Sequence, residues 1–82
     1  MDCFERIEAL IDAASADAID RARVLLDQFD DKSQTIVQAI DDFLLDLMTL
    51  VFVIESTQEM FHNPARRLAH MKLTRVRLLL AS

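Results

Sequence analysis

The chain has 82 residues, of which 52% are hydrophobic, and it carries a formal net charge of −5. The single hydrophobic core of a chain this short is barely sufficient to keep it folded, so disulfides, metals or oligomerisation usually add stability. An internal disulfide is excluded because Cys3 is the only cysteine, and one unpaired thiol fits a reducing compartment. The absence of glycine excludes Gly-rich phosphate loops and dinucleotide fingerprints.

The most apolar segment is FLLDLMTLVFVI at residues 43–54. It is too short and too interrupted for a membrane span, which needs about 20 apolar residues. No basic segment followed by an apolar stretch opens the chain, so we expect no signal peptide. No segment has the alternation typical of a strand. We therefore expect one all-α domain over residues 1–82, located in the cytoplasm.

A first helix is predicted over residues 3–30. Asp2 and Glu5 have the spacing of a capping box, which marks a helix start. A break at Ser15, a residue type that caps helices, is the alternative. The prediction of one long helix depends on an apolar stripe at helical spacing, formed by Phe4, Ile7, Ile11, Ala14, Ala18, Ala22, Leu25 and Phe29.

A second helix is predicted over residues 33–62, and a third over residues 64–80. Asp31 and Gln34 form another capping box, with Ser33 as an alternative cap. Asn63 suits a helix boundary and Pro64 the first turn of the third helix. The apolar stripes are Ile36, Ile40, Phe43, Leu47, Leu50, Ile54 and Phe61 in the second helix, and Ala69, Leu73, Val76 and Leu80 in the third.

Two helices of nearly 30 residues joined by a short turn should fold back as an antiparallel hairpin. Pairing about that turn places Ala18 opposite Phe43 and Phe4 opposite Phe61. A second apolar face of the second helix then stays open. Its residues are the predicted partner-binding set, Val37, Leu44, Leu45, Met48 and Phe52.

Leaving that face in water forgoes about 1.5–3 kcal/mol for each large side chain. Total stability for a small domain is only about 5–15 kcal/mol. A partner chain would remove the problem, and twofold dimers are the commonest oligomers. We therefore expect a homodimer in which the hairpin and the shorter third helix form a helical bundle.

Charge is divided unevenly along the chain. Residues 1–64 carry all fourteen acids and four bases, whereas residues 65–82 carry five bases and no acid. A basic segment can bind nucleic acid, but an acidic body repels a polyanion. Docking on Asp41, Asp42 or Asp46, in the same chain or a partner, is the favoured interpretation. The possible anion-binding residues are Arg66, Arg67, Lys72, Arg75 and Arg77.

One pair has the spacing of a metal motif. Glu59 and His62 are at i, i+3, as in di-iron carboxylate bundles. Such a site needs further Glu ligands on a facing helix, which Glu5 and Glu8 would have to supply. The pair also lies in the last turn of the predicted helix, a poor platform for a metal. We predict no metal and no cofactor.

The sequence offers only weak candidates for catalytic residues. The helix dipole can lower the pKa of the Cys3 thiol at the start of the first helix, but no neighbouring His supplies a base. Asp42 and Asp46 are at i, i+4, yet acid–base chemistry on sugars needs a cleft around two carboxylates. His70 is expected to be a surface residue. We predict that the chain is not an enzyme.

The favoured function is protein–protein interaction through an apolar helical groove, by helix-in-groove recognition. An adaptor, a secretion-chaperone-like protein or a toxin-neutralising protein would have this character. The expected partners are a second copy and another protein, without a membrane span. The alternative is a nucleic-acid-binding regulator using the basic third helix, followed by a metal-binding bundle.

Overall fold

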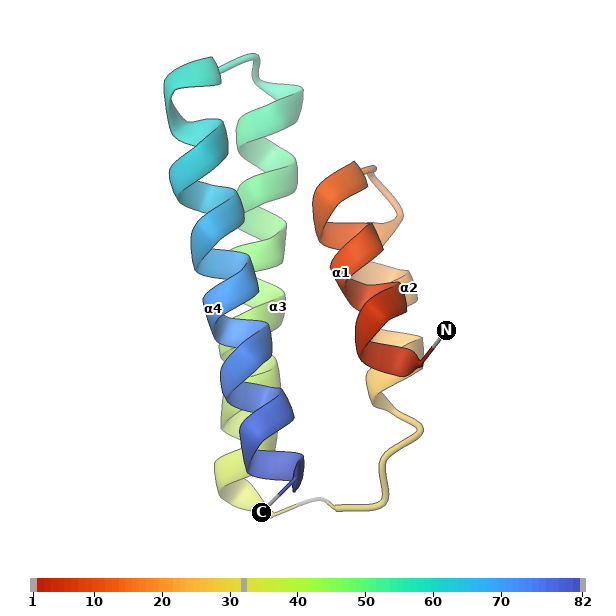
Figure 1. The fold of residues 1–82 in the computed structure, drawn as a ribbon. Helices are drawn as coiled ribbons and strands as arrows, with labels where there is room; N and C mark the ends of the chain where they lie inside the picture. Colours follow the sequence, from red (N-terminus) through yellow and green to blue (C-terminus); the bar gives the residue numbers. More distant parts are fainter. Residues whose placement is uncertain (1, 32, 82) are drawn as a thin grey trace.

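The computed structural model describes residues 2–31 and 33–81, and this part of the chain is all-α (Figure 1). None of the described helices is both long enough and apolar enough to cross a membrane. The elements in chain order are α1 Cys3–Ala13, α2 Ala18–Leu26, α3 Gln34–Glu55, the short 3₁₀ helix η1 Glu59–Phe61, and α4 His62–Ala81.

The chain breaks at Ser15, so the single helix expected over residues 3–30 is two helices. Ala14 takes the left-handed conformation with φ 46°, and its N–H donates to the Leu10 carbonyl at 2.8 Å. The Ser15 hydroxyl then donates to the Asp17 carboxylate at 2.6 Å. Ala14 and Ala18 are nevertheless both buried, because the turn keeps their side chains directed at the core.

The starts of α1 and α3 are capped by side chains. Asp2 accepts the Glu5 N–H at 2.8 Å, as the capping-box spacing predicts. Ser33, the alternative cap, accepts the Ile36 N–H at 3.4 Å, while Asp31 accepts the Ser33 N–H at 3.0 Å.

The end of α3 differs from the prediction. α3 stops at Glu55 because Thr57 takes a positive φ of 58° and reverses the chain. η1 then leads into α4, where Pro64 lies in the first turn as expected. The boundary therefore lies several residues before Asn63, which is itself helical.

Two antiparallel hairpins pack side by side (Figure 1). The longer hairpin is α3–α4 and the shorter is α1–α2; α2 also packs on α3, and α1 on α4. The end of the longer hairpin that carries η1 extends past α1 and α2. The expected hairpin of two long helices is therefore replaced by four helices around one core.

This arrangement corrects the expected neighbours of Phe4. The Phe4 and Phe29 rings lie 5.6 Å apart between centroids. The Arg77 guanidinium also lies over the Phe4 ring, 5.6 Å from its centroid. Phe4 is therefore near the C-terminal end of α4, whereas Phe61 directly precedes α4, so pairing Phe4 with Phe61 was wrong.

The core is shared by all four α-helices. α1 contributes Ile residues, α2 mostly alanine, and α3 the largest side chains. The α4 stripe is buried as predicted at Ala69, Leu73 and Val76, so the third helix belongs to the fold of its own chain. The side chains with no exposed surface are Ile7, Ile11, Ala18, Ala22, Phe43, Leu47, Leu50, Ala69 and Val76.

Candidate protein-binding surface

Exposed apolar side chains gather on the longer hairpin. Ten large apolar residues are exposed in the described part of the chain, and all except Val24 lie on α3, η1 or α4. Leu45, Met48 and Phe52 form one stripe at i, i+3, i+7 of α3. The set that we call the α3–α4 apolar surface consists of Leu45, Met48, Phe52, Phe61, Leu68, Met71 and Leu78.

A groove of about 380 Å³ runs between the two helices next to the η1 turn. Phe52 and Val53 line it from α3, and Phe61 and Leu68 from the other side. Phe52 is 63% exposed. Large aromatic side chains contribute strongly to binding when a partner buries them. The remaining lining residues are Asp46, Thr49, Gln58, Pro64 and Ala65.

The predicted partner-binding set is exposed except at one position. Val37, Leu45, Met48 and Phe52 have exposed side chains, whereas Leu44 is only 6% exposed and belongs to the core. Leu44 faces inward because α2 packs beside α3, which a long two-helix hairpin did not anticipate.

Most of the α4 half of the surface, including Leu68 and Leu78, was missed. Leu68, Met71 and Leu78 are exposed, and their surplus over a single apolar stripe was visible in the sequence. This surplus of apolar residues could be assigned to a surface only once the helix that packs against α4 was known. Because α4 pairs with α3, the surplus of both helices contributes to one exposed surface.

The two helices that form the groove have opposite charges. All charged residues of α3 are acidic, and those of α4 are basic in the described range 62–81. Lys72 Nζ lies 4.0 Å from Asp46 Oδ2, and Arg75 Nη1 lies 3.7 Å from Asp42 Oδ2. Lys72 and Arg75 thus dock on acids of the same chain, which was the favoured interpretation.

The possible anion-binding residues are not brought together. Lys72 and Arg75 face α3, whereas Arg66 and Arg77 face α1 through contacts with Asp12 and Phe4. Arg67 is exposed. Because the cations are spread over several sides of α4, they do not form the single basic face that a nucleic-acid backbone requires.

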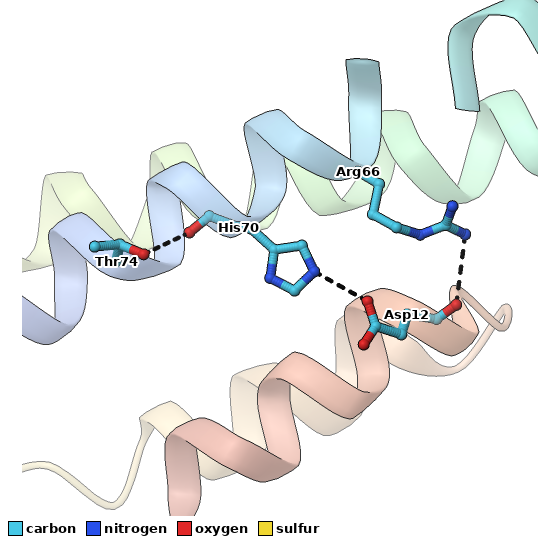
Figure 2. A network of polar contacts seen from close by, with 4 residues as sticks. All are labelled: Asp12, Arg66, His70 and Thr74. Atoms are coloured by element: carbon cyan, nitrogen blue, oxygen red, sulfur yellow. Dashed lines mark hydrogen bonds and ion pairs between the residues drawn. The ribbon is translucent and has the colours of Figure 1, made fainter. Parts of the chain in front are cut away.

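A polar network joins α1 to α4 (Figure 2). His70 Nε2 lies 3.0 Å from Asp12 Oδ1, and Arg66 Nη2 donates to the Asp12 carbonyl oxygen at 3.4 Å. Thr74 Oγ1 donates to the His70 carbonyl oxygen at 3.0 Å. His70 is therefore part of the seam between the two hairpins, which is a structural role.

The residues of the metal motif do not converge. Glu59 is exposed in η1, whereas His62 Nε2 is buried without a hydrogen-bond partner. Across the described residues, no group of three His, Cys, Asp or Glu side chains is close enough to hold a metal ion. Neither Glu5 nor Glu8 supplies a third ligand.

Cys3 is not activated by its position at the start of α1. Burial raises the pKa of the Cys3 thiol, and the Asp2 carboxylate raises it further, against a smaller opposing effect of Arg6. The thiol also donates to the Leu25 carbonyl oxygen at 3.5 Å. A raised pKa leaves less thiolate at neutral pH and makes a poor nucleophile.

A second groove, of about 570 Å³, lies between α1 and α2. Its exposed large apolar side chain is Val24, and its rim carries Arg6, Asp20 and Arg21. Arg21 is ion-paired with Asp17 at 2.8 Å. We place the candidate site on the other hairpin, because the exposed apolar side chains concentrate there.

Comparison with protein-family models, curated proteins and solved structures finds no match for this chain. The α3–α4 apolar surface offers apolar contact with opposite charges along its two helices. Such a surface suits a helix of another polypeptide, whose apolar face can enter the groove.

Proposed function

We propose that the chain is a non-catalytic protein-interaction module that binds helices of another polypeptide on the α3–α4 apolar surface. One observation carries this proposal: the exposed large apolar side chains of the described residues concentrate on one hairpin. Scattered apolar residues are ordinary on a protein surface, whereas a concentration of them marks an interaction site.

The energetics support binding. Each large side chain of the surface would gain up to about 1.5–3 kcal/mol on full burial. Phe52 and Leu68 line the two sides of the groove, so an incoming helix can place a ridge of side chains between them. Met48 and Met71 add flexible contacts that adapt to the shape of the partner.

Several protein classes would use such a surface in the cytoplasm: adaptors, secretion-chaperone-like proteins and toxin-neutralising proteins. A cytoplasmic location fits the single, partly buried Cys3 thiol. The nucleic-acid alternative is less well supported, because Lys72 and Arg75 lie near acids of their own chain.

Site-specific photo-cross-linking in the native host tests the proposal. A photoreactive phenylalanine analogue would replace Phe52, and the matched control would place it at Val24. These side chains are 63% and 64% exposed but belong to different hairpins. We expect a covalent adduct with a polypeptide from position 52 and little from position 24. Equal labelling at both positions, or no adduct at position 52, would contradict the proposal.

A further inference from the structure

We infer that the polypeptide on the α3–α4 apolar surface is a second copy of this chain, with α3 of each copy lying antiparallel against α4 of the other. This inference rests on the proposed function, because it names the occupant of the same surface. The twofold axis runs along the hairpin, between α3 and α4. The dimer interface is a four-helix layer, with the α1–α2 hairpins on its outer sides.

Charge selects this arrangement from the two that a twofold axis in the interface plane allows. An axis perpendicular to the helices would place α3 against α3 and α4 against α4. Asp41 and Glu55 are exposed on α3, and Arg67 is exposed on α4, so that arrangement brings like charges together. An axis along the hairpin places each acidic α3 opposite a basic α4, and opposite charges across an interface fix its register.

The ion pairs within one chain supply the register of the dimer. Asp46 is level with Lys72, and Asp42 with Arg75. A rotation about an axis along the hairpin keeps each residue at its own height. Leu45 therefore lies about one helical turn or less from the partner's Met71, given a rise of about 1.5 Å per residue. By the same register Phe52 lies near the partner's Leu68.

The two stripes match along their length. Asp41, Leu45 and Met48 are separated by four and then three residues on α3, and Arg75, Met71 and Leu68 have the same intervals when α4 is followed in the opposite direction, as antiparallel pairing requires. Spacings of three and four residues pack side by side in antiparallel bundles. Asp41 of α3 then lies near the partner's Arg75, so the charged position of the α4 stripe meets an acid.

The size of the surface suits a stable dimer. The chain has principal extents of 37 × 21 × 17 Å, and the hairpin runs along the longest of them. A face of these dimensions, two helices wide, can bury about 800 Å² per partner, the usual size for a specific interface.

Disulfide trapping tests both the occupant and its orientation. Leu45→Cys and Met71→Cys would be made separately in a Cys3→Ser background, mixed and oxidised. Both side chains are exposed, so their replacement should leave the fold intact, as circular dichroism would verify. We expect a covalent dimer that contains one chain of each variant, because the two positions face each other across the interface. A mixture of Val24→Cys with Met71→Cys is the control and should give little covalent dimer.

Sedimentation of the full chain provides the second measurement. We expect a dimer at micromolar concentration, with a dissociation constant raised at least roughly tenfold by Phe52→Asp and unchanged by Val24→Asp. Cross-linking of Leu45→Cys or Met71→Cys with itself, without the mixed dimer, would overturn the orientation. A monomeric wild-type chain would overturn the self-association. In that case a different polypeptide cross-linked at position 52 would leave the proposed function standing, whereas no adduct would remove both.

Discussion

The two hairpins use their apolar residues differently. The inward side of the α1–α2 hairpin includes Ala14, Ala18 and Ala22, and its exposed large apolar residue is Val24. The α3–α4 hairpin buries Phe43, Leu47 and Leu50 and still exposes nine large apolar side chains together with η1. Small side chains let helices approach closely, so nearly all the large apolar side chains of the shorter hairpin are covered within the chain. The longer hairpin carries more apolar surface than one chain can bury, and this surplus defines its binding surface.

The largest expected effect separates the inner and outer faces of α3. Phe43 has no exposed surface, so Phe43→Ala should reduce the free energy of unfolding by about 3–5 kcal/mol. Phe52→Ala should change it by no more than about 0.5 kcal/mol at concentrations where the chain is monomeric. Urea denaturation followed by circular dichroism measures both values. Similar losses for the two variants would show that the faces are wrongly assigned.

The next effect tests the close approach of the shorter hairpin. Ala18 is fully buried, so Ala18→Leu should force the hairpins apart and reduce the free energy of unfolding by about 1–3 kcal/mol. Val24→Leu adds apolar volume to the same helix at an exposed position and serves as the control. If Ala18→Leu is as stable as the control, the two hairpins are not closely packed at this point.

The turns of the two hairpins provide a smaller effect. Ala14 and Thr57 both adopt positive φ without being glycine, which costs roughly 1–2 kcal/mol for an L-residue. Thr57→Gly should therefore raise the free energy of unfolding by about 1 kcal/mol. Ala14→Gly should gain less, because the buried Ala14 methyl group loses its packing. Thermal unfolding of both variants would show the difference, and a lower melting temperature for Thr57→Gly would contradict it.

The smallest effect concerns the pH dependence of the shorter hairpin. The Ser15 hydroxyl, helped by the Arg21 guanidinium, holds the pKa of the Asp17 carboxyl below its usual value of 3.8. The unfolded chain then binds this proton more readily than the folded chain does. The contribution to stability is therefore present above the usual pKa and is lost as the pH falls through the lowered pKa.

Asp17→Asn should consequently lower the melting temperature slightly at neutral pH, and the difference should disappear as the pH falls through the lowered pKa of the Asp17 carboxyl. Ser15→Ala should reproduce part of this effect, because the Ser15 hydroxyl is the main cause of the lowered pKa. Melting temperatures measured across the acid range would test both variants. A difference from the wild type that stays constant with pH would rule out the carboxyl as its source.

The lack of strand-like alternation predicted the all-α class, the Asp2–Glu5 spacing predicted the capping of α1, and apolar periodicity predicted the burial of most of the α4 stripe. Periodicity could not decide between one long helix and the alternative break at Ser15, because Ala14 and Ala18 remain in phase with the stripe on both sides of the turn. No glycine or proline marks the reversal, since Ala14 itself takes the left-handed conformation. Helical spacing describes which residues share a face, but it carries no information about a turn that preserves that face.

The same limit explains the partial prediction of the candidate site. Leu45, Met48 and Phe52 were identified because an apolar surplus on a single helix is visible in its own spacing. Leu44 was misplaced because its burial depends on the contact of α2 with α3. Phe61 was assigned to an apolar stripe of the second helix, whereas the turn at Thr57 moves it to the groove between α3 and α4.

The polar network at Asp12, Arg66 and His70 has a kinetic consequence. The α1–α4 seam joins residues 54 to 58 positions apart in the chain, whereas the other main pairings join consecutive α-helices. Contacts between distant residues form late because closing a long loop costs entropy. The seam should therefore close last during folding and open first in the native state. Hydrogen exchange would show this as α1 amides exchanging through openings that leave α3 and α4 protected.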